Sequence, residues 1–206
     1  MLNKKRIAIL LGDPSGIGPE IVSKLLCEKI VDDANILVIG ERKILEDGEN
    51  ISGKKGNFKF VNNSKDIVFD DKTKFFLDIS KGTNRTYKYG QVSAESGASV
   101  LEAMDEAMDL ANNKKIDAVN FGPMNKTSLI MGGCPYNDEH DYFQKKLKMK
   151  EFCCEFNVID NFWTARVTSH IPIKEVPENI TKENILKPIK LINKTLKMSG
   201  IEKPRI

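Results

Sequence analysis

The sequence predicts an α/β protein whose mixed sheet is flanked by helices, and three observations predict this class. Two uninterrupted apolar runs, "RIAILLG" at 6–12 and "ANILVIG" at 34–40, are typical of parallel strands covered on both faces. An amphipathic segment lies between them. A short apolar run at 118–121 then leads into Gly-Pro and a helix-like segment, which repeats this order. Strands that alternate with helices favour a sheet with helical layers.

The first half of the chain divides into strands and two helices. "GPEIVSKLLCEKI" at 18–30 predicts a helix with Pro19 in its first turn. A stretch rich in Gly, Asn and Lys follows at 46–66, and we expect short strands around 58–61 and 74–77. From Val92, apolar residues at helical spacing predict a helix of about five turns. The expected buried faces are Ile21, Leu25, Leu26 and Ile30 in the first helix and Ala94, Ala98, Leu101, Met104, Met108 and Ala111 in the second.

The last third of the chain predicts a hairpin followed by a helix. Residues 152–169 contain two β-rich runs joined by a turn at Asp160-Asn161. An extended linker then leads to a helix that Thr181 caps. The side chains expected on the buried face of this helix are Ile185, Ile189 and Ile192. The final "IEKPRI" has the pattern of a strand that is about to begin.

The charge balance, the amino terminus and the cysteines exclude several classes of protein. The 206 residues contain 32 Lys and Arg against 29 Asp and Glu, interspersed, so we expect no nucleic-acid or membrane partner. Only about six apolar residues precede Gly12, too few for a signal peptide or a membrane span, which favours the cytoplasm. The four cysteines lack the spacing of a zinc site, and the two histidines are far apart. A metal ion would therefore need ligands distant in sequence or from another chain.

Polar residues follow the expected ends of two strands. "GDPSGIG" at 12–18 places Asp13, Ser15 and Gly16 after the first strand, where ligands of α/β sheets bind. Its glycine spacing matches neither a dinucleotide fingerprint nor a phosphate-binding P-loop, so a structural turn and a ligand loop are both open. "GPMNKTSL" at 122–129 places Asn125 and Lys126 at a helix start, which favours an anion; the alternative is a solvated lysine beside a helix cap.

Two further groups contain the histidines. His170, in "VTSHIPI", follows a β-rich run at a third polar strand end. A lone histidine there fits a hydrogen-bonded structural role as well as a ligand role. The segment "DEHD" at 138–141 includes Glu139 and His140. It suits a cation or a polar substrate, and on composition it suits the acidic start of a helix better.

Four motifs taken together carry a family resemblance. They are "IAILLGDPSGIGPEI", "GPMNKTSL", "GGCPY" and "TSHIPIKEVPENIT", in this order. The set resembles the amino-terminal part of the 4-hydroxythreonine-4-phosphate dehydrogenase family of vitamin B6 biosynthesis. The first motif also resembles a turn of isocitrate and isopropylmalate dehydrogenases, whose fold that family shares. The resemblance implies that residues 1–206 are the amino-terminal portion of a two-lobed dehydrogenase, with the carboxy-terminal part missing and no internal boundary evident.

The resemblance implies a reaction and a cofactor set. Family members oxidise a phosphorylated hydroxy acid with NAD or NADP and then decarboxylate it, as homodimers with a divalent metal ion (Zn, Mg, Co or Mn) at the interface. The resemblance assigns a role to the residue at each corresponding position. Asp13 and Lys126 would be catalytic, with Lys126 holding a carboxylate or phosphate, and His170 would be the first of three metal-binding histidines. The cofactor-binding residues would be Gly12, Ser15 and Gly16, and the substrate-binding residues would be Asn125, Glu139 and His140. The other two histidines would lie beyond Ile206.

One departure from the family pattern affects the substrate. Where the family has Gly-His-Thr-Glu, this chain has Asp-Glu-His-Asp at 138–141, so Glu139 and His140 replace a His-Thr pair that contacts substrate. A branch that acts on another hydroxy acid or on a cis-diol carboxylate is therefore an alternative. A truncated, non-catalytic relative that serves as a binding or dimerisation module is a second alternative.

Overall fold

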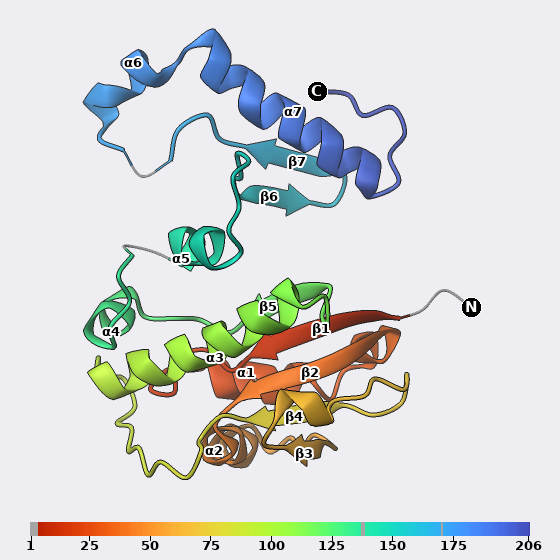
Figure 1. The fold of residues 1–206 in the computed structure, drawn as a ribbon, viewed down its shortest axis with the longest axis vertical. Helices are drawn as coiled ribbons and strands as arrows, with labels where there is room; N and C mark the ends of the chain where they lie inside the picture. The colour runs from red at the N-terminus through yellow and green to blue at the C-terminus, as the bar shows by residue number, and fades with distance from the viewer. Residues whose placement is uncertain (1–3, 137–138, 170) are drawn as a thin grey trace. The chain divides into compact units, whose positions relative to one another are not determined.

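The computed structural model describes residues 4–136, 139–169 and 171–206. The chain divides into two compact units, Met1–Leu147 and Lys148–Ile206, whose elements are shown in Figure 1. None of the helices in the described ranges is long and apolar enough to cross a membrane.

A five-stranded parallel sheet forms the centre of the first unit. Its strands are β1 (Lys5–Leu10), β2 (Ala34–Gly40), β3 (Lys59–Val61), β4 (Phe75–Asp78) and β5 (Ala118–Phe121), in the order β3-β4-β2-β1-β5. Leu10 lies opposite both Ile39 and Phe121, so the turns that follow β1 and β5 begin side by side. The α/β class is confirmed. The described strands form separate parallel and antiparallel sheets instead of one mixed sheet, because the antiparallel pair belongs to the second unit.

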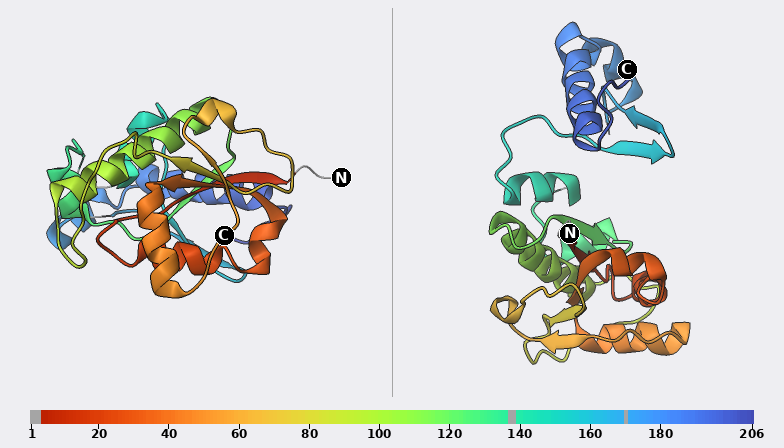
Figure 2. Two further views of the ribbon diagram at one scale, coloured as in Figure 1. Left: turned by 90° about the horizontal axis from the view of Figure 1, so that it is seen from below. Right: turned by 90° about the vertical axis from the view of Figure 1, so that its right-hand side faces the viewer.

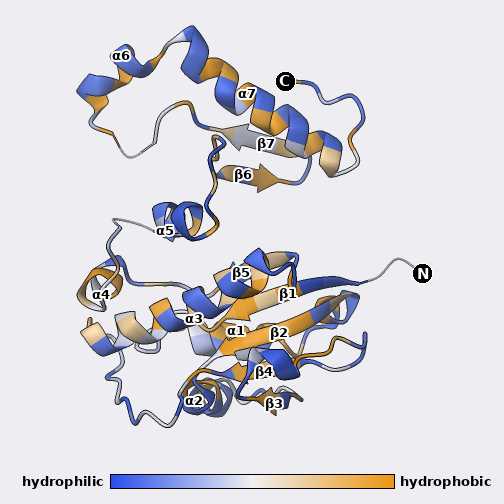
Figure 3. Cartoon of the chain, viewed as in Figure 1, coloured by the Kyte–Doolittle hydropathy of each residue, from blue (hydrophilic) through white to orange (hydrophobic). Residues whose placement is uncertain are grey.

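Helices cover both faces of this sheet. α1 (Gly18–Leu25) and α2 (Arg42–Ser52) lie on one face and α3 (Ala94–Asn112) lies on the other (Figure 2). The alternation of side chains in β1 produces these two layers, since Ala8 and Leu10 belong to the core on the α3 side and Ile9 and Leu11 to the core on the α1 side. Figure 3 shows how hydrophobic β2 is along its length. Short elements complete the unit: η1 (Lys29–Asp33), η2 (Ser64–Asp66), α4 (Lys126–Met131) and α5 (Glu139–Lys146).

Two expectations for the helices α1 and α2 are wrong. Ile21 and Ile30 are exposed, because α1 ends at Leu25 and its rotation is set by Gly18, where a Cβ would lie 2.2 Å from the Leu11 carbonyl oxygen. Val22, one helical turn after Gly18, is buried instead. In addition, no helix was predicted at 42–52, where α2 forms. Gly48 inside α2 is a contact point with α1 and not a helix breaker, since a Cβ there would lie 2.6 Å from the Pro19 carbonyl carbon.

The long helix expected from Val92 is confirmed as α3, but its buried face differs from the expected one. α3 has 19 residues, and Met104 and Met108 are buried as expected. The buried face also includes Ser96 and Ser99, whereas Ala94, Ala98, Leu101 and Ala111 are only half-buried. The polar side chains on this face have partners described below.

The second unit is a hairpin with a long helix. β6 (Phe156–Ile159) and β7 (Phe162–Ala165) are antiparallel, and Asp160 in the turn has a positive φ of 49°. η3 (Ile173–Glu175) and α6 (Val176–Asn179) precede α7 (Lys182–Met198), whose cap is Thr181, as predicted. The buried residues of α7 are Pro188, Ile192 and Leu196; the expected Ile185 is half-buried and Ile189 is exposed. Residues 201–206 contain no helix or strand.

Candidate ligand pocket

A pocket of about 340 Å³ lies at the carboxyl ends of β1 and β5. Its lining residues are Asp13, Ser15, Gly16, Ile17, Gly90, Gln91, Val92, Pro123, Met124 and Asn125. The chain passes from β1 to β2 on one side of β1 and returns to β5 on the other side, so the strand order reverses between β1 and β5. Ligands of open α/β sheets bind in the crevice at such a reversal. Four residues singled out in the sequence, Asp13, Ser15, Gly16 and Asn125, meet there.

The turn after β1 is held by its own polar groups and by the neighbouring turn. The Asp13 carboxylate oxygen Oδ1 accepts a hydrogen bond from the Ser15 backbone N–H at 2.8 Å. The Asp13 backbone N–H donates to the carbonyl oxygen of Pro123 at 2.9 Å. Both Asp13 and Ser15 are buried, with 6% and 5% of their surface exposed. The floor of the pocket is therefore a fixed backbone with two polar side chains.

The three glycines of this turn have different explanations. Gly12 has a φ of +82°, and a Cβ there would lie 2.6 Å from the Pro123 carbonyl oxygen. Gly18 would clash with Leu11 in the same way. At Gly16, by contrast, the nearest atom to an added Cβ is the Asp13 carbonyl oxygen at 3.5 Å, an ordinary contact. Packing thus accounts for Gly12 and Gly18 but not for Gly16, which lines the pocket.

The turn after β5 contains Asn125, which caps α4, and Lys126, which lies near Glu139. Asn125 caps α4, its Oδ1 accepting the Ser128 backbone N–H at 2.9 Å. The Lys126 ammonium lies 3.9 Å from Glu139 Oε2 of α5, and about half of the Lys126 side chain is exposed. That buried Glu139 oxygen has no hydrogen-bond donor within the described part of the chain. A distance of 3.9 Å is too long for a direct hydrogen bond, so both groups can still bind a further partner.

The two histidines add no geometry to this site. His140 lies in α5, but its side chain is outside what the structure describes, and His170 and Asp138 are outside the described residues altogether. Within the described ranges no three His, Cys, Asp or Glu side chains come close enough to hold a metal ion.

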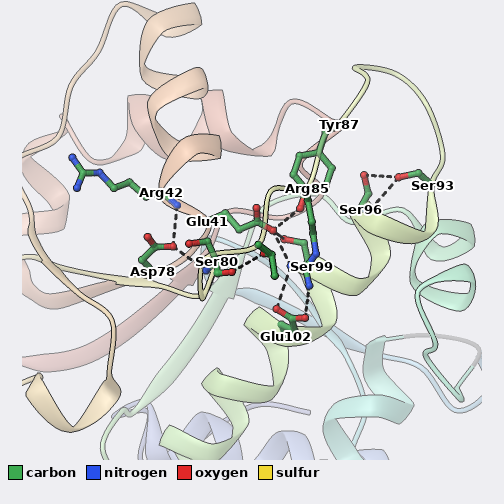
Figure 4. A network of polar contacts seen from close by, with 11 residues as sticks. Glu41, Arg42, Asp78, Ser80, Arg85, Tyr87, Ser93, Ser96, Ser99 and Glu102 are labelled. Carbon is green, nitrogen blue, oxygen red and sulfur yellow. Dashed lines mark hydrogen bonds and ion pairs between the residues drawn. The ribbon is translucent and has the colours of Figure 1, made fainter.

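One wall of the pocket and the polar cluster beside it were not predicted from the sequence. Gly90, Gln91 and Val92 come from the connection between β4 and α3, which has no apolar period to reveal it. Beside this wall, Glu41, Arg85, Tyr87, Ser99 and Glu102 form a set of polar contacts, called here the Glu41 network (Figure 4). Burial and the hydrogen bond to Glu41 raise the pKa of Tyr87 above its ordinary value, so the phenol is a donor at neutral pH. One signal was present: Glu41 directly follows a buried strand, as Asp13 nearly does.

Fold and pocket together define an α/β protein with a ligand crevice at the strand reversal of a parallel sheet. A family model described as "Pyridoxal phosphate biosynthetic protein PdxA" matches residues 32–206. The chain belongs to this family.

Individual relatives agree with this membership. A Pasteurella multocida protein named "Putative 4-hydroxythreonine-4-phosphate dehydrogenase" is 36% identical over 208 residues, which cover 100% of this chain and 62% of the relative. A Fusobacterium nucleatum protein named "Putative D-threonate 4-phosphate dehydrogenase" is 30% identical, over 96% of this chain and 60% of its own length. The crystal structure of a 4-hydroxythreonine-4-phosphate dehydrogenase from Burkholderia phymatum is 29% identical with a TM-score of 0.80, over 98% of this chain and 61% of that chain. The chain thus spans about three fifths of the length of these relatives.

Proposed function

We propose that these residues are the amino-terminal portion of a two-lobed dehydrogenase that oxidises a phosphorylated hydroxy acid with NAD or NADP. The observation that carries the proposal is the pocket at the strand reversal, where Asp13, Ser15, Gly16 and Asn125 converge. The names of the relatives, which cite 4-hydroxythreonine 4-phosphate and D-threonate 4-phosphate, supply the substrate class.

The proposed roles follow from the chemistry of each group. Asp13 provides a carboxylate on the pocket floor that can accept the proton of a substrate hydroxyl. Gly16 lets the cofactor or substrate approach the backbone. Ser15 and the backbone of Gly12 shape the cofactor side of the same turn. In this proposal Asn125 contacts the substrate.

Lys126 and Glu139 divide recognition of the substrate between them. The Lys126 ammonium attracts a substrate carboxylate or phosphate. Among the described residues, Glu139 Oε2 is a buried acceptor without a donor, and a substrate hydroxyl would satisfy it. A ligand that carries an anion and a neighbouring hydroxyl suits this pair. The same pair would serve another hydroxy acid or a cis-diol carboxylate.

The metal ion, the decarboxylation, the homodimer and the cytoplasmic location stay predictions. A divalent ion would polarise the alcohol oxygen and stabilise the enolate formed on loss of carbon dioxide. The described side chains do not form a three-ligand site, so we derive no step through the metal. His170, with ligands from elsewhere, is its proposed holder, and His140 is proposed to contact the substrate.

Turnover by the full-length protein that contains these residues tests the proposal. The assay follows the absorbance of reduced nicotinamide with NAD or NADP, each phosphorylated substrate, and Zn, Mg, Co or Mn. We expect metal-dependent reduction, and we expect Lys126→Met to raise KM by about tenfold or more because a charge-assisted contact is lost. Lys115→Met, an exposed lysine at the other edge of the sheet, is the matched control and should leave KM unchanged.

The opposite result has a definite meaning. If neither nicotinamide cofactor binds saturably and no substrate is oxidised, the dehydrogenase proposal is wrong for this chain. The non-catalytic binding or dimerisation module then becomes the function to test.

A further inference from the structure

The wall of the pocket formed by Gly90, Gln91 and Val92 depends on anchors outside the pocket. The Gly90 backbone N–H donates to the Ser15 carbonyl oxygen at 2.8 Å, which ties the wall to the pocket floor. Gln91 and Val92 themselves are exposed. The wall therefore has little packing of its own, and its place depends on the residues that precede it.

Those preceding residues, Arg85 and Tyr87, are both held by one buried carboxylate. Glu41 is 5% exposed, and its Oε1 accepts hydrogen bonds from Arg85 Nη1 at 3.0 Å, from Ser99 Oγ at 2.7 Å and from the Tyr87 hydroxyl. Arg85 also pairs with Glu102 of α3, its Nη1 lying 3.2 Å from Oε2. Figure 4 shows Arg85 and Tyr87 converging on Glu41 from the same connection.

α3 links this anchor to the pocket floor. Ser96 and Ser99 are three residues apart, so they lie on one face of the helix. The Ser96 hydroxyl lies 2.6 Å from the Ser15 hydroxyl on the floor, and the Ser99 hydroxyl binds Glu41. One rigid helix thus holds the floor directly and the wall through Glu41.

We propose that Glu41 is a positioning residue for the ligand pocket. It fixes Arg85 and Tyr87, and through them it sets the place of the wall at 90–92. If one hydrogen-bond donor to Glu41 is removed, the buried carboxylate loses part of its stabilisation. We then expect the whole connection at 85–92 to become less firmly held. The identity of the ligand rests on the proposed function, but the link between Glu41 and the wall does not.

Hydrogen exchange of the intact protein tests the link without a ligand. The variants are Tyr87→Phe and Glu41→Gln, and the matched control is Asp117→Asn, which breaks the pair with Arg6 beside the amino ends of the strands. Within 85–92 the amides of Gly90 and Gln91 donate backbone hydrogen bonds, and we expect their protection to fall about tenfold in the first two variants, the scale of one hydrogen bond to a charged group. Asp117→Asn should not lower the protection of this segment beyond any loss that follows from a lower stability of the whole first unit.

Ligand measurements then separate positioning from simple destabilisation. With NAD as the probe, we expect the Kd to rise several-fold in Tyr87→Phe and not in Asp117→Asn, and in turnover we expect KM to change more than kcat. Unchanged protection at 85–92, or an equal loss over the whole first unit, would overturn the inference. If wild-type protein binds no cofactor while the exchange result holds, the proposed function fails and the role of Glu41 stands.

Discussion

At the scale of single residues, the turn after β1 contains glycines that are required for different reasons. Gly12 needs its positive φ and the absence of a Cβ, because the turn after β5 touches it. Gly16 has neither constraint. The difference makes structural and ligand-related glycines separable by substitution.

Alanine at these two positions should therefore have different effects, on stability at Gly12 and on ligand binding at Gly16. Gly12→Ala should lower the free energy of unfolding by about 2 kcal/mol or more, from the positive φ and the clash with Pro123. Gly16→Ala should leave the free energy of unfolding within about 1 kcal/mol of wild type. Urea denaturation measures both changes. Gly16→Ala should instead weaken cofactor binding, and an unchanged Kd would exclude Gly16 from the ligand site.

The carboxylate of Glu139 should oppose anion binding at Lys126. Glu139→Gln removes a negative charge 3.9 Å from the ammonium, and because about half of the Lys126 side chain is exposed, this should tighten binding of inorganic phosphate only about threefold. Isothermal titration of phosphate gives the Kd. Glu183→Gln, which affects an exposed pair with Lys187 in α7, serves as the control. Equal phosphate affinity in all three proteins would remove Lys126 from the anion site.

The sequence could predict part of this site for a physical reason. Asp13 and Asn125 follow the neighbouring parallel strands β1 and β5, and parallel strands place such residues at one end of the sheet. Tyr87 could not be found in this way, because its hydrogen-bond partner Glu41 is distant in sequence, and Gln91 could not because it lies in a connection without a periodic pattern. Partners that are distant in sequence leave no local signal.

At the scale of elements, one ion pair joins β1 to the start of β5. Arg6 Nη2 lies 2.8 Å from Asp117 Oδ1, and the Arg6 backbone N–H also donates to Asp117 Oδ2. The hydrogen bonds from Arg6 lower the pKa of Asp117 below its ordinary value. The pair lies at the amino ends of β1 and β5, and neither residue lines the pocket at their carboxyl ends, so we expect it to contribute to stability and not to ligand binding.

The pH dependence of stability should reflect this pair. Because the folded pKa of Asp117 is depressed, its contribution is fully present above the unfolded pKa of about 4 and is lost as the pH falls through the lower folded value. Asp117→Asn should therefore be less stable than wild type at neutral pH and should lose less stability between neutral and strongly acidic pH. Thermal unfolding across that range measures the difference, and parallel curves would contradict it.

The strands were easier to predict than the helical faces. β2 and β5 have the predicted bounds, since continuous apolar runs bounded by Gly or Pro leave little choice. Which face of a helix is buried depends on contacts with neighbouring elements, and the spacing of apolar residues does not reveal these contacts. Gly18 and Gly48 set how α1 and α2 meet, so Val22 is buried and Ile21 is exposed.

At the scale of the whole molecule, the first unit has its own cores. Both large hydrophobic clusters consist of residues before position 148, and all five strands of the parallel sheet lie there. The second unit has a smaller buried set, centred on Ile192 and Leu196 of α7.

The first unit should fold by itself. A fragment of residues 1–147 is expected to unfold in one cooperative transition in urea, because it retains both cores and every parallel strand. The single tryptophan, Trp163, is absent from this fragment, so tyrosine fluorescence is used beside circular dichroism. The two probes should give the same midpoint, because the transition is expected to have two states. A gradual transition would show that residues 148–206 are needed for cooperativity.

The backbone contact between Gly12 and the turn after β5 also limits how this pocket can change over evolutionary time. Neither Gly12 nor Gly122 can gain a side chain without pushing the two turns apart. We therefore expect new ligand preferences to arise on the other wall of the pocket, at exposed Gln91 and Val92. A protein engineer who wants to change the ligand preference should randomise those two positions and keep the floor as it is.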